Sequence, residues 1–268
     1  RARRRALGVD AGEEPEDSGL ARVTPAQLEA FHRRCFRPER AVVAVHGRVD
    51  PKSVRDLVQA LLGVGGWADL APVPPMRVPP VEPVPSGIRD TVVPGNAGLG
   101  ACALCWQVPG AEAGKETMAR LLLLDAVVGQ GKGARLFGLR ERLGIAYEVR
   151  SALEPGFRLG SWSLTAMGRR GGIEYRDRLT EVVRAIADGS APVAAEELAR
   201  ARGLLLGQRE VAGAMGWSRA RRTAAWEALG HGECDRELPT LLAAATSPQL
   251  AETARRILAG RPGVVRTA

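Results

Sequence analysis

Histidine is scarce in this chain of 268 residues, which contains three copies, His32, His46 and His231. Two histidines hold a metal ion from one helix face only when their positions place them on the same side of adjacent turns. No two histidines here have that spacing. The sequence therefore excludes a catalytic zinc site built on a helical histidine pair within this chain.

Lysine and aromatic residues are also few. The formal net charge is +8, but lysine occurs only at positions 52, 115 and 132, so arginine carries nearly all of the positive charge. Aromatic residues make up 4% of the chain, whereas nucleic-acid grooves combine basic side chains with stacking aromatics. The basic clusters at residues 1–5 and 219–222 are typical of solvated helix faces, and the wealth of arginine, alanine and glycine indicates a GC-rich, bacterial coding sequence. We expect no nucleic-acid partner.

Long apolar runs and a disulfide framework are absent as well. Residues 121–128 are far shorter than the roughly 18 residues that span a bilayer, so we expect no membrane partner. The four cysteines show no disulfide pattern. Cys102 and Cys105 have the spacing of a metal pair, but strand residues three apart point to opposite faces, so we predict core thiols. We favour a cytoplasmic location, although a removed signal peptide is compatible with the sequence.

Proline divides the chain. Apolar residues at 45% and charged residues at 25% are ordinary for a folded protein. Seven prolines between positions 72 and 85 predict an extended linker over residues 65–87. Helices at 24–37 and 50–62, with a buried strand at 41–46, precede it. We therefore predict that residues 1–64 are the tail end of an N-terminal α+β half and that residues 88–268 form a C-terminal α+β half.

Beyond the linker, strands and helices come in groups rather than in strict alternation. The predicted strands cover 89–94, 99–107, 145–153, 157–167 and 263–266, and the predicted helices cover 115–128, 172–188, 193–208, 215–229 and 247–258. This grouping favours an α+β fold with helices packed on a mostly antiparallel sheet. The glycine-rich loop at 129–133 lacks the spacing and the preceding strand of a phosphate-binding loop. We interpret it as a flexible connection.

A helix-and-strand pattern occurs twice. Thr24-Pro25-Ala26-Gln27-Leu28 recurs as Thr246-Ser247-Pro248-Gln249-Leu250, and a Val-Val pair follows each copy at the same offset of 222 residues. Thr24 with Gln27 predicts a capping box and Pro25 a helix start. A period of 222 residues does not fit twice into 268. We therefore expect the tail of a first copy, whose front is missing, and all of a second.

Residues 134–147, ARLFGLRERLGIAY, are the most informative stretch of the chain. Apolar positions recur there at helical spacing, at Leu136, Leu139 and Leu143. Gly144 stands where a left-handed helix cap is favoured, and a strand is expected immediately behind it. Arg140 and Tyr147 lie on opposite sides of this junction, seven residues apart.

This stretch resembles the insulinase/pitrilysin family of zinc metallopeptidases (inverzincins), whose C-terminal half carries a similar Arg-Leu-Phe, Leu-Arg-Glu, Leu-Gly and Tyr series. Residues 20–64 resemble the end of the family's first half, and residues 87–268 resemble its second half. The resemblance implies two α+β halves that face each other, with Arg140 and Tyr147 as catalytic residues that reach a zinc site in the other half. It also implies peptide substrates.

The family's zinc signature, H-x-x-E-H, does not occur in this sequence. We therefore expect no metal ligand and no cofactor in this chain, which would be inactive alone. Zinc is expected in a homologous partner subunit or in the missing N-terminal half. Arg140 and Tyr147 would then stabilise the negative charge that develops on the peptide carbonyl oxygen during hydrolysis.

Three functions fit these observations. The first is the Arg–Tyr subunit of a two-subunit peptidase, a heterodimer with a zinc-bearing chain. The second is the back portion of a single-chain zinc metalloendopeptidase. The third is a catalytically inactive structural relative that acts as a scaffold subunit; the presence of both Arg140 and Tyr147 argues against it.

Overall fold

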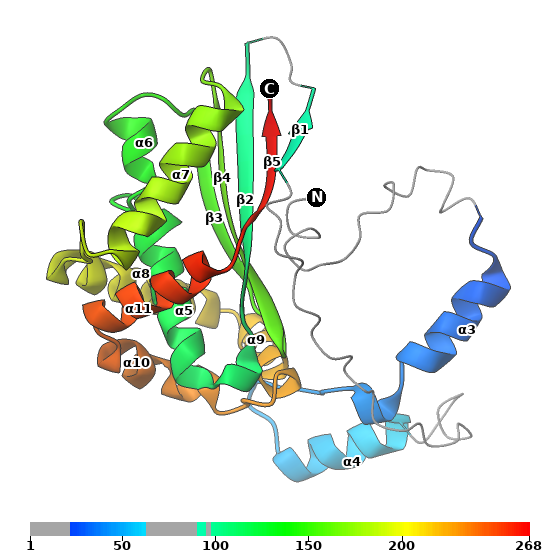
Figure 1. Cartoon of the computed structure of the whole chain (residues 1–268). Coiled ribbons are helices and arrows are strands. Elements are labelled where there is room, and N and C mark those ends of the chain that lie inside the picture. The colour runs from blue at the N-terminus through cyan, green and yellow to red at the C-terminus, as the bar shows by residue number, and fades with distance from the viewer. Residues whose placement is uncertain (1–21, 63–89, 95–97) are drawn as a thin grey trace.

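The structure is a computed structural model that describes residues 22–62, 90–94 and 98–268 (Figure 1). Its helices are α3 (Pro25–Cys35), α4 (Pro51–Leu62), α5 (Lys115–Gly129), α6 (Phe137–Glu141), α7 (Gly172–Ala187), α8 (Ala195–Gly213), α9 (Gly216–Ala228), α10 (Cys234–Ala244) and α11 (Ser247–Ala259). Its strands are β1 (Asp90–Val93), β2 (Gly100–Pro109), β3 (Glu148–Glu154), β4 (Leu159–Gly168) and β5 (Gly263–Thr267).

The five strands form one sheet in the order β1-β5-β2-β4-β3. β2, β4 and β3 are antiparallel neighbours, and β5 is antiparallel to β2 but parallel to β1. β5, the last strand in the sequence, therefore lies between β1 and β2, the first two described strands. The predicted α+β class with a mostly antiparallel sheet is confirmed.

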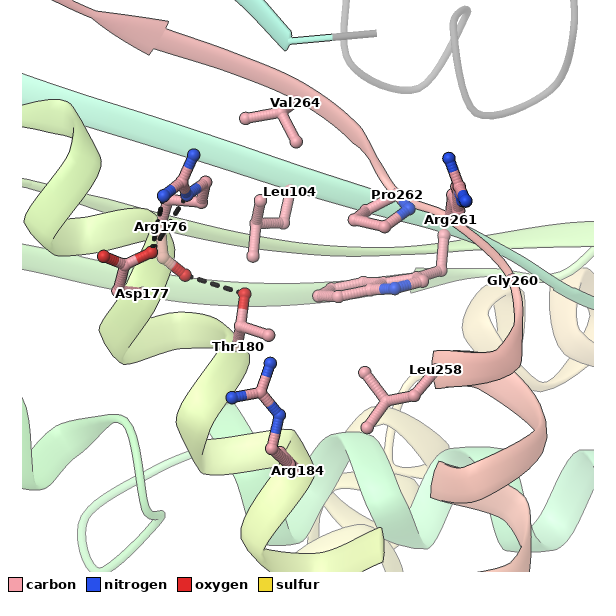
Figure 2. A pocket seen from close by; sticks show the side chains of 11 residues that line it. Leu104, Arg176, Asp177, Thr180, Arg184, Leu258, Gly260, Arg261, Pro262 and Val264 are labelled. Atoms are coloured by element: carbon pink, nitrogen blue, oxygen red, sulfur yellow. Dashed lines mark hydrogen bonds and ion pairs between the residues drawn. The ribbon is translucent and has the colours of Figure 1, made fainter. Parts of the chain in front are cut away.

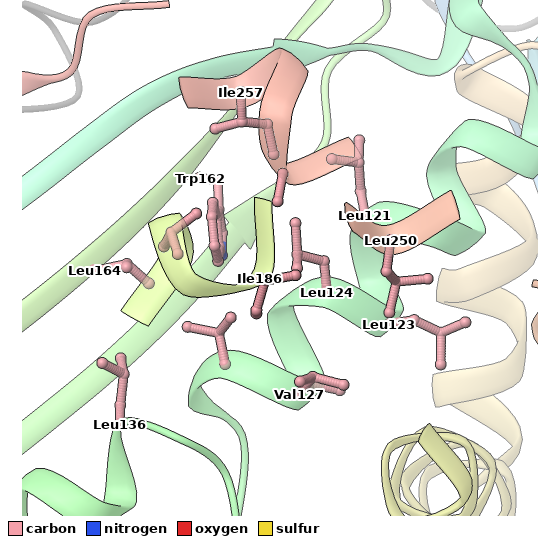
Figure 3. Close-up of a cluster of buried hydrophobic side chains, with 14 of the residues drawn as sticks. Leu121, Leu123, Leu124, Val127, Leu136, Trp162, Leu164, Ile186, Leu250 and Ile257 are labelled. Carbon is pink, nitrogen blue, oxygen red and sulfur yellow. The ribbon is translucent and has the colours of Figure 1, made fainter. Parts of the chain in front are cut away.

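One face of the sheet carries the core. Leu104 and Trp106 of β2 and Trp162 and Leu164 of β4 are two residues apart on their strands and point to this face. In β4 the intervening Ser163 is less buried, whereas in β2 the intervening Cys105 is buried on the other face. Helices α7 and α11 contact β2 on this face, and α5 contacts β3, α8, α10 and α11. Figure 3 shows how α5 contributes to the same cluster. The labelled side chains from α5 are Leu121, Leu123, Leu124 and Val127.

A polar group lies inside this apolar cluster. The side chain of Asp125, on α5, is 1% exposed. One of its carboxyl oxygens accepts a hydrogen bond of 2.7 Å from the indole Nε1 of Trp162, and the other accepts one from the amide of Gln130. The first bond links α5 to β4, and the second links the loop after α5 to the same carboxylate. Buried polar groups require such partners, because an unpaired one costs free energy of folding.

Cys102 and Cys105 are core residues, as predicted. Cys102 and Cys105 are 2% and 0% exposed, and all four thiols are free. Cys102 belongs to the main core, whereas Cys105 packs with Ala103 and Val265 on the other face of the sheet. Burial raises the pKa of the Cys102 thiol to about 12.

The two copies of the repeat begin alike and then differ. In both, the threonine N–H donates to the glutamine side chain at 2.9 Å, so both predicted helix starts are confirmed. The second copy continues into β5, but residues 41–46 form no strand, and the prediction of a buried strand there is wrong. A strand needs a neighbouring strand to which its backbone N–H and C=O groups can form hydrogen bonds. No described strand pairs with these residues. Val43 and Val45 are 55% and 53% exposed.

Two further predictions need correction. The sequence predicted no helix between residues 229 and 247, where α10 lies, with Pro239 inside it. The helix around Arg140 is only five residues long, and Leu143, predicted on its apolar face, is 58% exposed. The linker at 65–87 lies outside the described residues, so the division into 1–64, 65–87 and 88–268 stays a prediction.

Candidate functional site

The site predicted from the sequence lies where α6 turns into β3. The chain reverses at Gly144, whose φ of +60° is in the left-handed region that favours glycine. The N–H groups of Ile145 and Ala146 then donate to the carbonyl of Leu139, at 3.1 and 3.4 Å. These bonds hold the backbone just before Tyr147 against the residue just before Arg140. The structure thus brings the backbones of the two predicted catalytic residues together.

Both side chains are accessible. The Arg140 side chain is 54% exposed; its guanidinium lies 5.8 Å from the centre of the Phe137 ring and 3.7 Å from the Glu141 carboxylate. Tyr147 is 78% exposed. These are weak surface contacts that leave the guanidinium and the phenol available to another molecule. Neither side chain has a structural task in the core.

A second tyrosine, which the sequence did not reveal, forms a hydrogen bond to the backbone of this junction. Tyr175 on α7 is completely buried, and its hydroxyl donates to the carbonyl of Ile145 at 2.6 Å and accepts from the N–H of Arg170 at 3.2 Å. A Cβ on Gly168 would lie 2.4 Å from that hydroxyl and 3.0 Å from the backbone nitrogen of Tyr147. Tyr175 and Gly168 therefore determine where the backbone of Tyr147 lies.

We expect Tyr175→Phe to lower the free energy of unfolding by about 1 kcal/mol, because the partly buried carbonyl of Ile145 loses its donor. Hydrogen exchange at residues 145–147 should become faster in the same variant. Tyr147→Phe is the matched control, since its exposed hydroxyl contributes no buried bond and the expected change in stability is below about 0.5 kcal/mol. Equal effects of the two substitutions would contradict a positioning role for Tyr175.

The face of the sheet away from the core is open beside this junction. A hollow of about 300 Å³ lies there, bordered by small side chains of β2 and by Glu148, Thr165 and Met167 of β3 and β4. Tyr147 adjoins it, because its N–H donates to the carbonyl of Met167 at 2.8 Å. An extended chain needs such a shallow, partly apolar surface. The open sheet face therefore adjoins the Arg140–Tyr147 junction at Tyr147.

Among the residues that the structure describes, no group of three or more histidine, cysteine, aspartate or glutamate side chains is placed to hold a metal ion. In the same part of the chain, no helix is long and apolar enough to cross a membrane. The glycine-rich loop at 129–133 connects α5 to the turn before α6, and Arg200 donates to its carbonyl at Gln130. It is a connection, as predicted.

Residues 22–205 match the family model described as the peptidase M16 inactive domain. The chain belongs to the peptidase M16 family. The insulinase-type resemblance carried by residues 134–147 is confirmed by this match.

Curated relatives of this chain include mycobacterial proteins. A zinc protease of Mycobacterium tuberculosis is 33% identical over 180 residues, which cover 67% of this chain and 39% of the relative. A zinc protease of Mycobacterium leprae is 30% identical over 183 residues, which cover 68% of this chain and 39% of the relative. The chain thus matches well under two thirds of the length of these relatives.

Several solved structures have the same fold. A protease from Helicobacter pylori superposes with a TM-score of 0.78 at 17% identity, over 93% of this chain and 60% of that one. The M16 inactive domain from Pseudomonas fluorescens superposes with a TM-score of 0.76 at 17% identity, over 98% of this chain and 63% of that one. At this level of identity the likeness shows the fold alone.

Proposed function

We propose that this chain is the half of an M16 peptidase that binds no zinc, and that Arg140 and Tyr147 stabilise the tetrahedral intermediate at a zinc site in a homologous half. One observation carries the proposal. An inactive-type M16 domain presents an arginine and a tyrosine at one junction, both exposed and without a structural task. A domain that served only as a scaffold would gain nothing from this pair.

The chemistry of the two side chains suits this role. When a zinc-bound hydroxide attacks a peptide carbonyl, negative charge develops on the carbonyl oxygen. Arg140 stays charged and offers rigid N–H donors, and Tyr147 donates an O–H without adding charge. Donors aimed at the developing charge stabilise the transition state more than the substrate, which is what raises the rate.

The exposed apolar side chains of α3 and of residues 41–46 support the presence of a homologous partner half. Leu28 of α3 is 60% exposed, whereas Leu250, its counterpart in the second copy, is 0% exposed in the core. Val42 is 39% exposed, whereas its counterpart Val264 is 1% exposed. The first copy thus keeps the apolar residues that the second copy buries under α5, α7 and β2. An α+β half related to residues 88–268 would cover them.

Reconstitution tests the proposal. The isolated chain should hydrolyse no quenched fluorescent peptide, and it should bind no stoichiometric zinc in metal analysis after dialysis. Together with a homologous half that contains H-x-x-E-H, supplied as a separate subunit or within one longer chain, we expect zinc-dependent hydrolysis that a chelator abolishes. Peptidase activity of the isolated chain that survives chelation would refute the proposal.

The two arrangements of the peptidase are distinguished by the source of the zinc motif. A separate polypeptide that carries H-x-x-E-H and co-purifies with this chain would establish a two-subunit enzyme. The same motif in a single longer chain would establish a self-sufficient one. An assembly that forms stably with a motif-bearing half yet cleaves no peptide would favour the scaffold function. The substrate peptide and the cytoplasmic location stay predictions.

A further inference from the structure

The hollow on the open sheet face owes its shape to the middle strand of the sheet. There β2 carries two short side chains, Ala101 and Ala103, whereas the strands on both sides of it carry longer ones. Met167 of β4 is the register partner of Ala101. Thr165 of β4 and Val265 of β5 are the register partners of Ala103. Two alanines between longer side chains thus leave a depression of about 300 Å³.

The floor and walls of this hollow can be reached from outside. All of the side chains that form them are partly exposed: Ala101, Ala103, Thr165, Met167 and Val265. Figure 2 shows the opposite side of β2 and β5, where a larger cavity of about 570 Å³ lies beside α7. Leu104 and Val264 border that cavity but are 0% and 1% exposed. The accessible side of these two strands is therefore the open face.

The hollow is apolar at its centre, and the charges at its ends are already paired. At the β3 end, Glu148 forms an ion pair with Arg150. At the β5 end, Arg266 pairs with Asp90 at 2.9 Å, and the hydroxyl of Thr267 accepts a backbone N–H of β2 at 3.0 Å. A charged side chain that entered would lose its water and meet charges that are already paired. An apolar side chain would instead remove apolar surface from water.

The sheet fixes how far this hollow lies from the candidate catalytic pair. Tyr147 immediately precedes β3, and β3 and β2 are separated by β4 alone. Two strand spacings amount to about 10 Å. An extended peptide covers about 10 Å with roughly three residues. A peptide whose reacting carbonyl lies at Tyr147 therefore brings the side chain of a residue about three positions away over Ala101 and Ala103.

We propose that this hollow is a specificity subsite, which accepts a large apolar side chain of the peptide substrate about three residues from the bond that is cleaved. The inference rests on the proposed function, because it names the substrate class of the same site. A volume of about 300 Å³ is at the lower end of ligand pockets and suits one aromatic or aliphatic side chain. Glu148 at the rim repels an acidic side chain.

Peptide binding to the purified chain tests the subsite without any catalysis. The methionine methyl groups are labelled with carbon-13, and the resonance that disappears in Met167→Leu identifies Met167. The probe is a heptapeptide of alanine and glycine with one central phenylalanine. We expect it to shift the Met167 methyl resonance, because an aromatic ring changes the magnetic field at nearby nuclei. Met118, in the core, and Met215, between α8 and α9, are internal controls and should not move.

Two further peptides test the chemistry of the hollow. Heptapeptides with a central alanine or glutamate in place of the phenylalanine should bind at least about tenfold more weakly, since they lose the apolar contact. A Met167 resonance that stays in place at millimolar phenylalanine peptide would overturn the proposal. Equal affinity for the phenylalanine and glutamate peptides would overturn it as well.

Matched variants test the position of the subsite. Ala103→Leu fills the hollow and should lower the affinity for the phenylalanine peptide at least about tenfold. Ala152→Leu is the control, because it adds the same atoms to the same face, on β3 and outside the hollow. It should bind the peptide as the unmodified chain does. Should Ala103→Leu fail to fold, Glu148→Gln provides the test, since it should strengthen binding of the glutamate peptide alone.

Kinetics of the zinc-containing assembly separate this proposal from the proposed function. We expect Ala103→Leu to lower kcat/KM for the phenylalanine peptide at least about tenfold and to leave that for the alanine peptide unchanged. A selective Met167 shift in a chain whose assembly cleaves no peptide would support the subsite and refute the catalytic role. Cleavage that ignores the side chain, without a Met167 shift, would support the peptidase and refute the subsite.

Discussion

We expect Arg140→Gln to lower the kcat of the complete zinc-containing assembly by about 10²–10³, because one donor to the tetrahedral intermediate is lost. The KM should change little, because the donor acts on charge that develops only in the transition state. The measurement is steady-state hydrolysis of a quenched fluorescent peptide. Tyr147→Phe, which removes only the phenol O–H, should lower kcat by a similar factor.

The control for this result is Arg142→Gln, an arginine two positions away on the same exposed turn, which should leave kcat unchanged. Because Arg140 and Tyr147 are exposed, neither substitution should alter the melting temperature by more than a degree or two. An unchanged kcat in Arg140→Gln, in an assembly that binds zinc and hydrolyses peptide, would refute the catalytic assignment. It would leave the family membership and the fold untouched.

The second large effect concerns stability. We expect Asp125→Ala to lower the free energy of unfolding by about 3 kcal/mol, because the indole N–H of Trp162 and the amide of Gln130 both lose their acceptor inside the core. For a domain of this size, that corresponds to a fall in melting temperature of about 6–12 °C. Thermal unfolding followed by circular dichroism measures it. Asp177→Ala, an exposed aspartate on α7, is the control.

The two paired tryptophans provide a second test of the same bond. Trp162→Phe and Trp106→Phe remove the same atoms from neighbouring positions of one sheet. Only Trp162 donates a hydrogen bond, so we expect Trp162→Phe to destabilise the domain by about 1–3 kcal/mol more than Trp106→Phe. Equal losses would show that the bond to Asp125 contributes nothing to stability.

Sequence patterns predicted the helices and strands whose signals lie within a few consecutive residues. The strands β2 and β4 and the capped starts of α3 and α11 could be predicted without knowledge of distant residues. Residues 41–46 have a strand's composition, but a strand also needs a partner, which no local pattern reveals. Helix α10 was missed because Pro239 disfavours a helix interior, and packing of Cys234 and Leu242 in the core overrides that preference.

The candidate site was predictable only in part. The family pattern marks Arg140 and Tyr147, and the glycine stop between them predicts that the backbone reverses there. Nothing in the local sequence shows that Tyr175, on a helix more than twenty residues later, contacts the same turn. One signal was available: Tyr175, Leu179, Val183 and Ile186 follow the buried face of α7, and a tyrosine on such a face needs a partner for its hydroxyl.

The position of β5 in the sheet has a consequence for how the protein folds. Leu104 and Val264 are register partners, yet 160 residues separate them in the sequence (264 − 104). Contacts between such distant residues form late, because the chain must first lose the entropy of closing a long loop. Until β5 arrives, β1 has no neighbour and β2 presents a free edge to other molecules. The yield of soluble protein should therefore depend on concentration during refolding, since a second chain competes with β5 for that edge.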